Sequence, residues 1–187
     1  RSQRPPRQAG SGGRDGQKTL STAVLFDPRK KRGTRLAEGL ATPRSEHSAT
    51  LLPDGSVLIL GGTDASGLIA TDAERYLPAT GKFEGVAELG LLARSKHRAT
   101  VLADGRILIT GGIDGRGIAL YDAELLDPRT LEVERFNVKL ETARFSHVAT
   151  LLPSHAVLLW GGSGADGKPL ANAEIFDPTA LRFVPYD

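Results

Sequence analysis

The stretch SEHSATLLPDGSVLILGG at 45–62 decides the fold, because the same motif recurs twice with substitutions. Residues 95–112 read SKHRATVLADGRILITGG and residues 145–162 read FSHVATLLPSHAVLLWGG, so each copy is shifted by 50 residues. A motif repeated at so long and regular a spacing marks one supersecondary unit used several times. Each copy is too small to bury its apolar face without a neighbour.

The register extends beyond this block without insertions. An Ala-Glu pair begins a second shared motif that ends in proline, at 73–78, 123–128 and 173–178, and a partial copy precedes it at 23–28. Nothing upstream of that partial copy resembles the half of the unit that runs from histidine to Gly-Gly. The chain therefore contains three full units and one half unit.

Within a unit the apolar pattern alternates with a period of two, in short runs that end at turns, which predicts strands rather than helices. Four strands fit each unit. The first ends at a hairpin signal, Asp54-Gly55 or Asp104-Gly105, which the third copy replaces with Ser154-His155, so its turn geometry stays open. The second strand, at 57–60, 107–110 and 157–160, is nearly all apolar and is expected to be covered on both faces. The fourth carries Phe83, Val133 or Phe183.

The paired glycines after the second strand permit backbone conformations, or a close approach by a neighbouring sheet, that a Cβ would forbid. A phosphate-binding loop is the alternative, but no helix pattern and no Lys-Ser/Thr continuation follows any of the pairs. We therefore expect the glycines to serve packing.

Four antiparallel strands per unit with Gly-Gly after the second resemble the kelch repeat, whose blades assemble into a β-propeller. The resemblance covers about residues 20–187 and includes a large apolar residue ahead of the proline-closed turn, namely Phe26, Tyr76, Leu126 and Phe176. The tryptophan usual in kelch strand four is absent. The resemblance implies an all-β propeller segment of about 3.5 blades. Its expected parts are a flexible basic leader at 1–18, a half blade of outer strands at 19–43, and blades at 44–93, 94–143 and 144–187.

Propellers close with roughly four to eight blades, and three and a half would leave sheet faces and edges exposed. Two explanations stay open. These residues are an excerpt of a longer chain, or two copies associate to complete a seven-bladed ring.

Composition and charge narrow the classes of partner. No apolar run approaches the length of about eighteen residues that crosses a bilayer. Residues 1–35 hold ten Lys and Arg against two Asp, a net of +8. The stretch from Arg1 to Gly16 is rich in Arg, Gly, Pro, Gln and Ser, which predicts a flexible segment. Aromatic residues are not interleaved with these cations, so we expect no nucleic-acid binding. The compartment is not fixed, with a slight preference for a secreted or extracytoplasmic location.

Residues used once per unit are expected to be scaffold. His47, His97 and His147 would be about 10 Å apart on stacked sheets, whereas zinc needs ligand nitrogens near 2 Å, so we predict no metal and no cofactor. The same reasoning assigns Glu74, Glu124 and Glu174 to structural hydrogen bonding.

The residues that differ most between the repeated units lie in loops at 63–72, 113–122 and 163–172. Loops on a rigid scaffold commonly carry recognition. The predicted partner-binding residues are cations and carboxylates of this rim: Arg44, Arg94, Arg144, Asp64, Asp114, Arg116, Asp166 and Lys168. For the arginines, the alternative is that each bonds loop carbonyls of a neighbouring blade.

Two functions stay open. The resemblance implies a non-catalytic scaffold that binds a protein, peptide or glycan. Some kelch-type propellers are copper-radical oxidases instead, and that chemistry needs a tyrosine crosslinked to cysteine. This chain has no cysteine and only Tyr76, Tyr121 and Tyr186, so such a site would have to lie in other sequence. No catalytic triad or paired-carboxylate spacing is recognisable either, and we predict no enzymatic activity.

Overall fold

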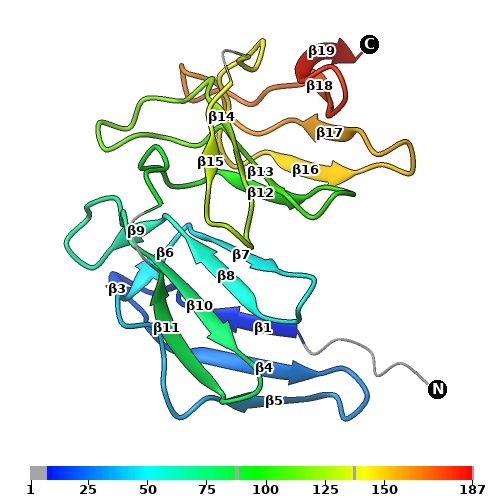
Figure 1. The fold of residues 1–187 in the computed structure, drawn as a ribbon. Coiled ribbons are helices and arrows are strands. Elements are labelled where there is room, and N and C mark those ends of the chain that lie inside the picture. Colours follow the sequence, from blue (N-terminus) through cyan, green and yellow to red (C-terminus); the bar gives the residue numbers. More distant parts are fainter. Residues whose placement is uncertain (1–7, 87–88, 137, 187) are drawn as a thin grey trace. The chain divides into compact units, whose positions relative to one another are not determined.

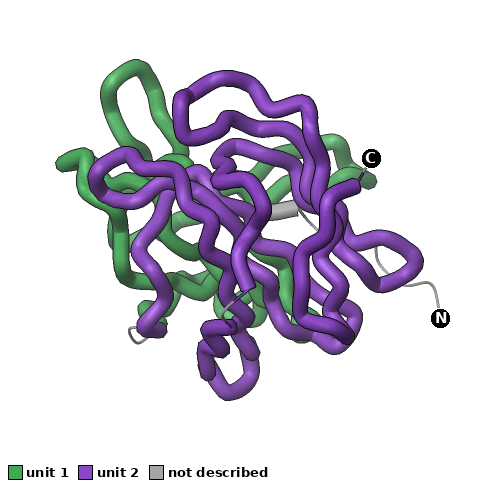
Figure 2. Tube along the Cα trace, turned by 90° about the horizontal axis from the view of Figure 1, so that it is seen from above, with its two compact units in different colours: residues 1–87 green, residues 88–187 purple. Residues whose placement is uncertain are grey.

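The computed structural model describes residues 8–86, 89–136 and 138–186, and within these ranges the chain forms strands and turns and contains no helix (Figure 1). It divides into two compact units, residues 1–87 and 88–187 (Figure 2). Each unit contains two antiparallel sheets of the repeat.

The first unit begins with a three-stranded sheet in the order β1-β4-β5, formed by Gln8–Ser11, Ala23–Asp27 and Arg32–Arg35. The next sheet has the order β11-β10-β8-β7, with β7 at Ser48–Leu51, β8 at Val57–Leu60, β10 at Ala73–Leu77 and β11 at Lys82–Val86. Two short ribbons complete the unit, β2 (Arg14–Asp15) with β3 (Lys18–Thr19), and β6 (Arg44–Ser45) with β9 (Thr63–Asp64).

The second unit repeats the four-stranded sheet twice. Its first sheet contains β12 (Arg98–Val101), β13 (Ile107–Thr110), β14 (Ala123–Leu126) and β15 (Val133–Glu134) in that order. Its second sheet contains β16 (Val148–Leu151), β17 (Val157–Trp160), β18 (Ala173–Asp177) and β19 (Arg182–Tyr186). The prediction of four-stranded antiparallel sheets is confirmed.

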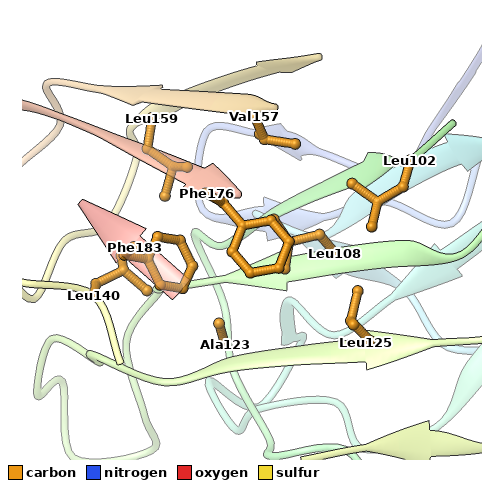
Figure 3. Packing of buried hydrophobic residues seen from close by; sticks show 9 residues of the cluster. All are labelled: Leu102, Leu108, Ala123, Leu125, Leu140, Val157, Leu159, Phe176 and Phe183. Atoms are coloured by element: carbon orange, nitrogen blue, oxygen red, sulfur yellow. The ribbon is translucent and has the colours of Figure 1, made fainter. Parts of the chain in front are cut away.

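The sheets of a unit pack face to face through apolar side chains. In the second unit, Leu108 and Leu125 of one sheet lie against Val157, Phe176 and Phe183 of the other (Figure 3). All five are at most 5% exposed. In the first unit, Val57, Ile59 and Tyr76 form the corresponding core, with Leu25 of the first sheet packed on it. Because each buried side chain of this size contributes about 1.5–3 kcal/mol, these two cores hold the sheets of each unit together.

The first sheet is more complete than its sequence indicates, and the leader predicted at 1–18 is wrong over residues 8–18. Strand β1 pairs with β4 along its whole length. Gly12 and Gly13 then take the place of Gly111 and Gly112. The amide of Gly13 donates to the Arg44 carbonyl at 2.8 Å, as that of Gly112 donates to the Arg144 carbonyl at 2.9 Å. This sheet therefore has the counterparts of strands two, three and four. The part of the predicted leader at 1–7 lies outside the described residues.

The hairpin turn that the sequence left open in the third copy has the geometry of the other two. His155 has a φ of 68°, in the left-handed region where Gly55 and Gly105 have 86° and 90°. Its amide donates to the Leu152 carbonyl at 2.9 Å, as the Gly105 amide does to that of Leu102 at 3.0 Å. A residue with a Cβ therefore occupies a position that favours glycine.

Candidate functional site

The arginine ahead of each first strand is buried in its own sheet. Arg44 and Arg144 are 0% exposed and Arg94 is 2% exposed. In the second copy, Nη2 of Arg94 donates to Glu124 at 2.6 Å, and Nη1 donates to the carbonyls of Gly111 at 2.9 Å and Asp122 at 3.0 Å. The guanidinium thus joins the Gly-Gly segment to the start of the third strand.

The other two arginines make the same bonds. Arg44 reaches Glu74 at 3.0 Å and the Gly61 carbonyl at 3.2 Å. Arg144 reaches Glu174 at 2.6 Å and the Gly161 carbonyl at 3.0 Å. Their burial argues against the prediction that these arginines contact a partner. The alternative was also inexact, because the carbonyls belong to the same sheet and not to a neighbouring one.

The three glutamates extend this network to the segment that leads into each sheet. The Glu74 carboxylate accepts from the amides of Ala41 at 2.7 Å and Thr42 at 3.2 Å, and Glu174 accepts from the amides of Glu141 and Thr142 in the same way. Their structural role in hydrogen bonding is confirmed.

His47 and His147 each connect two neighbouring sheets of one unit. Nε2 of His147 is hydrogen-bonded to the Thr110 hydroxyl of the preceding sheet at 3.0 Å. Burial, together with the charges of Arg144 and Arg98, lowers the pKa of His147 to about 3, and burial also lowers the pKa of His47. Both imidazoles are therefore neutral at pH 7. Across the described residues, no three His, Cys, Asp or Glu side chains are grouped as a metal site requires.

The exposed part of the predicted rim consists of three hairpins, at 63–72, 113–122 and 163–172, which we call the variable hairpins. Asp64 and Asp114 each fold their hairpin back on itself, since one carboxylate oxygen accepts the amides two and four residues ahead. The hydroxyl of Ser66 and three backbone amides lower the pKa of Asp64, and the amide of Ile118 is the main cause of the lowered pKa of Asp114. Both aspartates shape the loop more than they present charge.

The tips of the variable hairpins differ from copy to copy. Two residues after Asp64, Asp114 or Gly164, the chain has Ser66, Arg116 or Asp166, and the position two further on is Leu68, Ile118 or Lys168. Arg116 forms an ion pair with Asp114 at 3.1 Å, and Lys168 pairs with Asp166 at 3.2 Å, with the lysine side chain 81% exposed. These three charged residues of the prediction do lie on the surface.

Sequence reasoning missed the apolar residues of the same hairpins. Leu68 is 68% exposed, Ile118 is 49% exposed and Tyr121 is 45% exposed. Leu68 and Ile118 each follow a glycine in an otherwise polar turn, which is the signal that would have singled them out. Large apolar side chains held on a hydrogen-bonded loop are typical of a contact surface.

Two of the variable hairpins belong to adjacent sheets. Those at 113–122 and 163–172 both follow the second strand of their sheet, and these sheets share one core. Because stacked sheets are about 10 Å apart, the two hairpins lie side by side at the same end of the second unit. Their exposed side chains include Arg116, Ile118, Tyr121, Asp166 and Lys168.

No helix of the described residues is long and apolar enough to span a membrane.

Comparison with known proteins gives the fold. No protein-family model matches the chain, and no curated protein matches its sequence. The solved structure of YjhT aligns with 98% of this chain at a TM-score of 0.77 and 15% sequence identity. This chain covers 66% of the YjhT chain, just under two thirds of its length. At that identity the likeness shows the fold alone, and it confirms an all-β propeller segment built from four-stranded antiparallel sheets.

Proposed function

We propose that this chain is a kelch-type propeller scaffold that binds a protein or peptide through its variable hairpins. Gly-Gly after an apolar second strand, in three copies, is the motif that supports the kelch assignment. The structural neighbour YjhT, a kelch-type propeller, is consistent with it. The arginines and glutamates that recur in the complete sheets are buried in the scaffold, as are His97 and His147. We therefore assign partner recognition to the variable hairpins, whose sequences differ from copy to copy.

The observation that carries the proposal is the exposed apolar pair Ile118 and Tyr121. Both lie on a hairpin whose backbone is fixed by Asp114, so little conformational entropy is lost when a partner covers them. Arg116 on the same hairpin, and Asp166 and Lys168 on the hairpin of the adjacent sheet, add exposed charges, a composition that suits an apolar centre with a polar rim. Aliphatic tips favour a protein or peptide over a glycan. No catalytic step is proposed, and the oxidase alternative rests on residues outside this chain.

Selection from a displayed peptide library on the immobilised chain tests the proposal. The peptides selected should lose about tenfold or more in affinity when Ile118→Asp and Tyr121→Ala are combined, a difference of about 1.4 kcal/mol. The matched control is Leu131→Asp, which changes a 36% exposed leucine in the turn at the other end of β14. Equal loss in both variants, or no selection at all, would contradict the assignment.

A further inference from the structure

The last sheet of the chain has an open apolar face. Val148, Trp160, Ala173 and Tyr186 are directly paired across its four strands, so their side chains lie in one row on the same face. Val148 and Trp160 are each 60% exposed and Tyr186 is 57% exposed. The next row on this face adds Leu158, Ile175 and Val184, which are half-buried. We call this surface the terminal face.

The same face of the preceding sheet is covered. Leu108, Thr110, Ala123 and Leu125 occupy the equivalent positions, and each is at most 4% exposed because the last sheet packs on them. Two further contacts close that interface, the bond from the Gly112 amide to the Arg144 carbonyl and the contact of the His147 ring with Gly111. At the terminal face, the nearest atom to a Cβ built on Gly161 is the Leu170 carbonyl oxygen, 3.6 Å away in the same hairpin. The terminal face thus presents to solvent the kind of apolar surface that the equivalent face of the preceding sheet buries.

The first sheet presents the other half. Leu25 packs on the core of the first unit, so Val24 and Phe26, its neighbours along β4, point away from that core. They are 41% and 38% exposed. Phe26 holds the position of Phe176, which in the second unit packs on Leu108 and Leu125. We call the surface formed by Val24, Phe26 and Gly33 the leading face.

We propose that the leading face of one copy of this chain packs on the terminal face of a second copy, in a head-to-tail association. Phe26 of one copy would then contact Leu158 and Ile175 of the other, as Phe176 contacts their equivalents within the chain. At two positions these faces differ from the interface between the two sheets of the second unit. Both differences favour packing of the leading face on the terminal face.

The first difference is on the leading face. Val24 stands where the complete sheets have Glu74, Glu124 and Glu174. Each of those glutamates bonds a buried arginine from the segment before its first strand, and the first sheet has no such segment among the described residues. A glutamate at 24 would be buried by association without its partner, whereas valine is favourable there.

The second difference is on the terminal face. Trp160 is the largest side chain at its position, where the other sheets have Ser11, Leu60 and Thr110. In the second unit this position faces the imidazole of the following sheet, as Thr110 faces His147. The leading face brings no imidazole, so a larger side chain is needed to fill the same space. The indole of Trp160 supplies that volume.

Charge favours unlike ends over like ends. Residues 1–87 contain 13 Lys and Arg against 9 Asp and Glu, a net of +4, and residues 88–187 contain 11 against 13, a net of −2. Head-to-tail contact brings opposite charges together, whereas contact between two terminal faces brings like charges together.

Sedimentation of the 187-residue chain over a range of concentrations tests the association, with tryptophan emission recorded on the same samples. Trp160 is the one tryptophan of the sequence, so its emission reports the terminal face alone. We expect a monomer at low concentration that converts to a dimer, with a blue shift of the emission as the indole is covered. A chain that stays monomeric with unchanged emission overturns the proposal.

Substitutions identify which faces meet. Trp160→Arg and Phe26→Arg should each abolish the dimer, whereas Leu68→Arg, a change at an exposed apolar residue outside both faces, should retain it. Mixing the Trp160→Arg and Phe26→Arg chains should restore a heterodimer, because one intact contact is then possible. Circular dichroism and thermal unfolding of each variant check that it remains folded. A dimer that survives Phe26→Arg but not Trp160→Arg means that two terminal faces meet, and overturns head-to-tail pairing.

Discussion

At the scale of single residues, a buried arginine is tolerated in each complete sheet because both terminal nitrogens of the guanidinium have acceptors. Arg94 bonds Glu124 and the carbonyls of Gly111 and Asp122, with fork geometry that lysine does not reproduce. Removing one member of a buried ion pair leaves the other charge without compensation, which is costlier than losing both. The pair therefore acts as one unit.

We expect Arg94→Ala to lower the free energy of unfolding by about 3–5 kcal/mol, because Glu124 is then buried with only the partly exposed Arg135 to pair with. Urea unfolding followed by circular dichroism measures the loss. Arg116→Ala is the control, since that arginine is 79% exposed and its ion pair should contribute less than about 1 kcal/mol. Similar losses for the two variants would show that the buried network is unimportant.

The buried histidine of the last sheet should make stability depend on pH. Since the pKa of His147 falls from 6.5 to about 3 on folding, the unfolded chain binds a proton between these values that the folded chain refuses. Stability contributed by the neutral ring is thus complete above pH 6.5 and decreases toward pH 3 by up to about 1.4 kcal/mol per pH unit.

Urea unfolding of wild type and His147→Gln at several pH values between 3 and 7 tests this dependence. We expect the difference in free energy of unfolding between the two proteins to shrink as the pH falls. Leu159→Ala, which removes a buried side chain without a titrating group, should keep a constant difference from wild type. A constant difference for His147→Gln as well would exclude the ring as the cause.

The sequence aligns the three repeated arginines correctly, but it does not predict that they are buried. Arginine is among the residues least often buried, so its recurrence at 44, 94 and 144 indicates either a partner-binding rim or bonds to loop carbonyls of a neighbouring blade. Its partner glutamate follows 30 residues later, on a strand that only the sheet register brings next to it. Burial of a charge depends on such long-range pairing, which a repeat pattern does not reveal.

At the scale of the structural elements, the glycine pairs at 12–13 and 111–112 lie where the next sheet of the same unit docks. A Cβ on Gly111, where φ is 57°, would overlap the Arg144 carbonyl of the following sheet. Gly161 has a similar φ of 63°, but among the described residues the nearest atom to a Cβ built there is the Leu170 carbonyl oxygen of its own hairpin, 3.6 Å away. A substitution at Gly161 therefore tests backbone strain alone, whereas a substitution at Gly111 tests backbone strain together with the docking of the next sheet.

We expect Gly161→Ala to cost about 1–2 kcal/mol, the strain of a left-handed residue with a Cβ. Gly111→Ala should cost about 2–5 kcal/mol, because the overlap also forces two sheets apart. Chemical unfolding of both variants, at concentrations where the chain is monomeric, gives the comparison. Equal costs would show that contact with the next sheet does not depend on this glycine.

The sequence predicted the strands that are apolar or punctuated by turns, and missed β1, which is neither, together with the two-residue strands β2, β3, β6 and β9. Strand β1 reads QAGS and has no β-branched or aromatic residue, so its pairing with β4 comes from the backbone and from its neighbours. The sequence does not predict the geometry of the hairpin turn at 153–156, for a related reason. His155 adopts a left-handed conformation that hydrogen bonds on both sides of the turn enforce, against its own preference.

At the scale of the whole molecule, charged residues are distributed unevenly between the two units, just as each unit has its own open apolar face. The repeat makes successive sheets interchangeable in their cores, yet cations gather in the first unit and carboxylates in the second. Such asymmetry does not affect how a sheet folds, but it does affect which ends approach one another in solution.

Salt dependence separates the two ways in which copies can meet. Raising sodium chloride from about 0.1 M to about 1 M shortens the Debye length from about 10 Å to about 3 Å, which screens charges on the two units. Head-to-tail association between units of +4 and −2 should then weaken, so the concentration at half-association should rise several-fold. Pairing of two terminal faces would respond in the opposite direction, because screening removes repulsion between like charges. Light scattering at the two salt concentrations, with the Leu68→Arg chain as a control for changed net charge, decides between these responses.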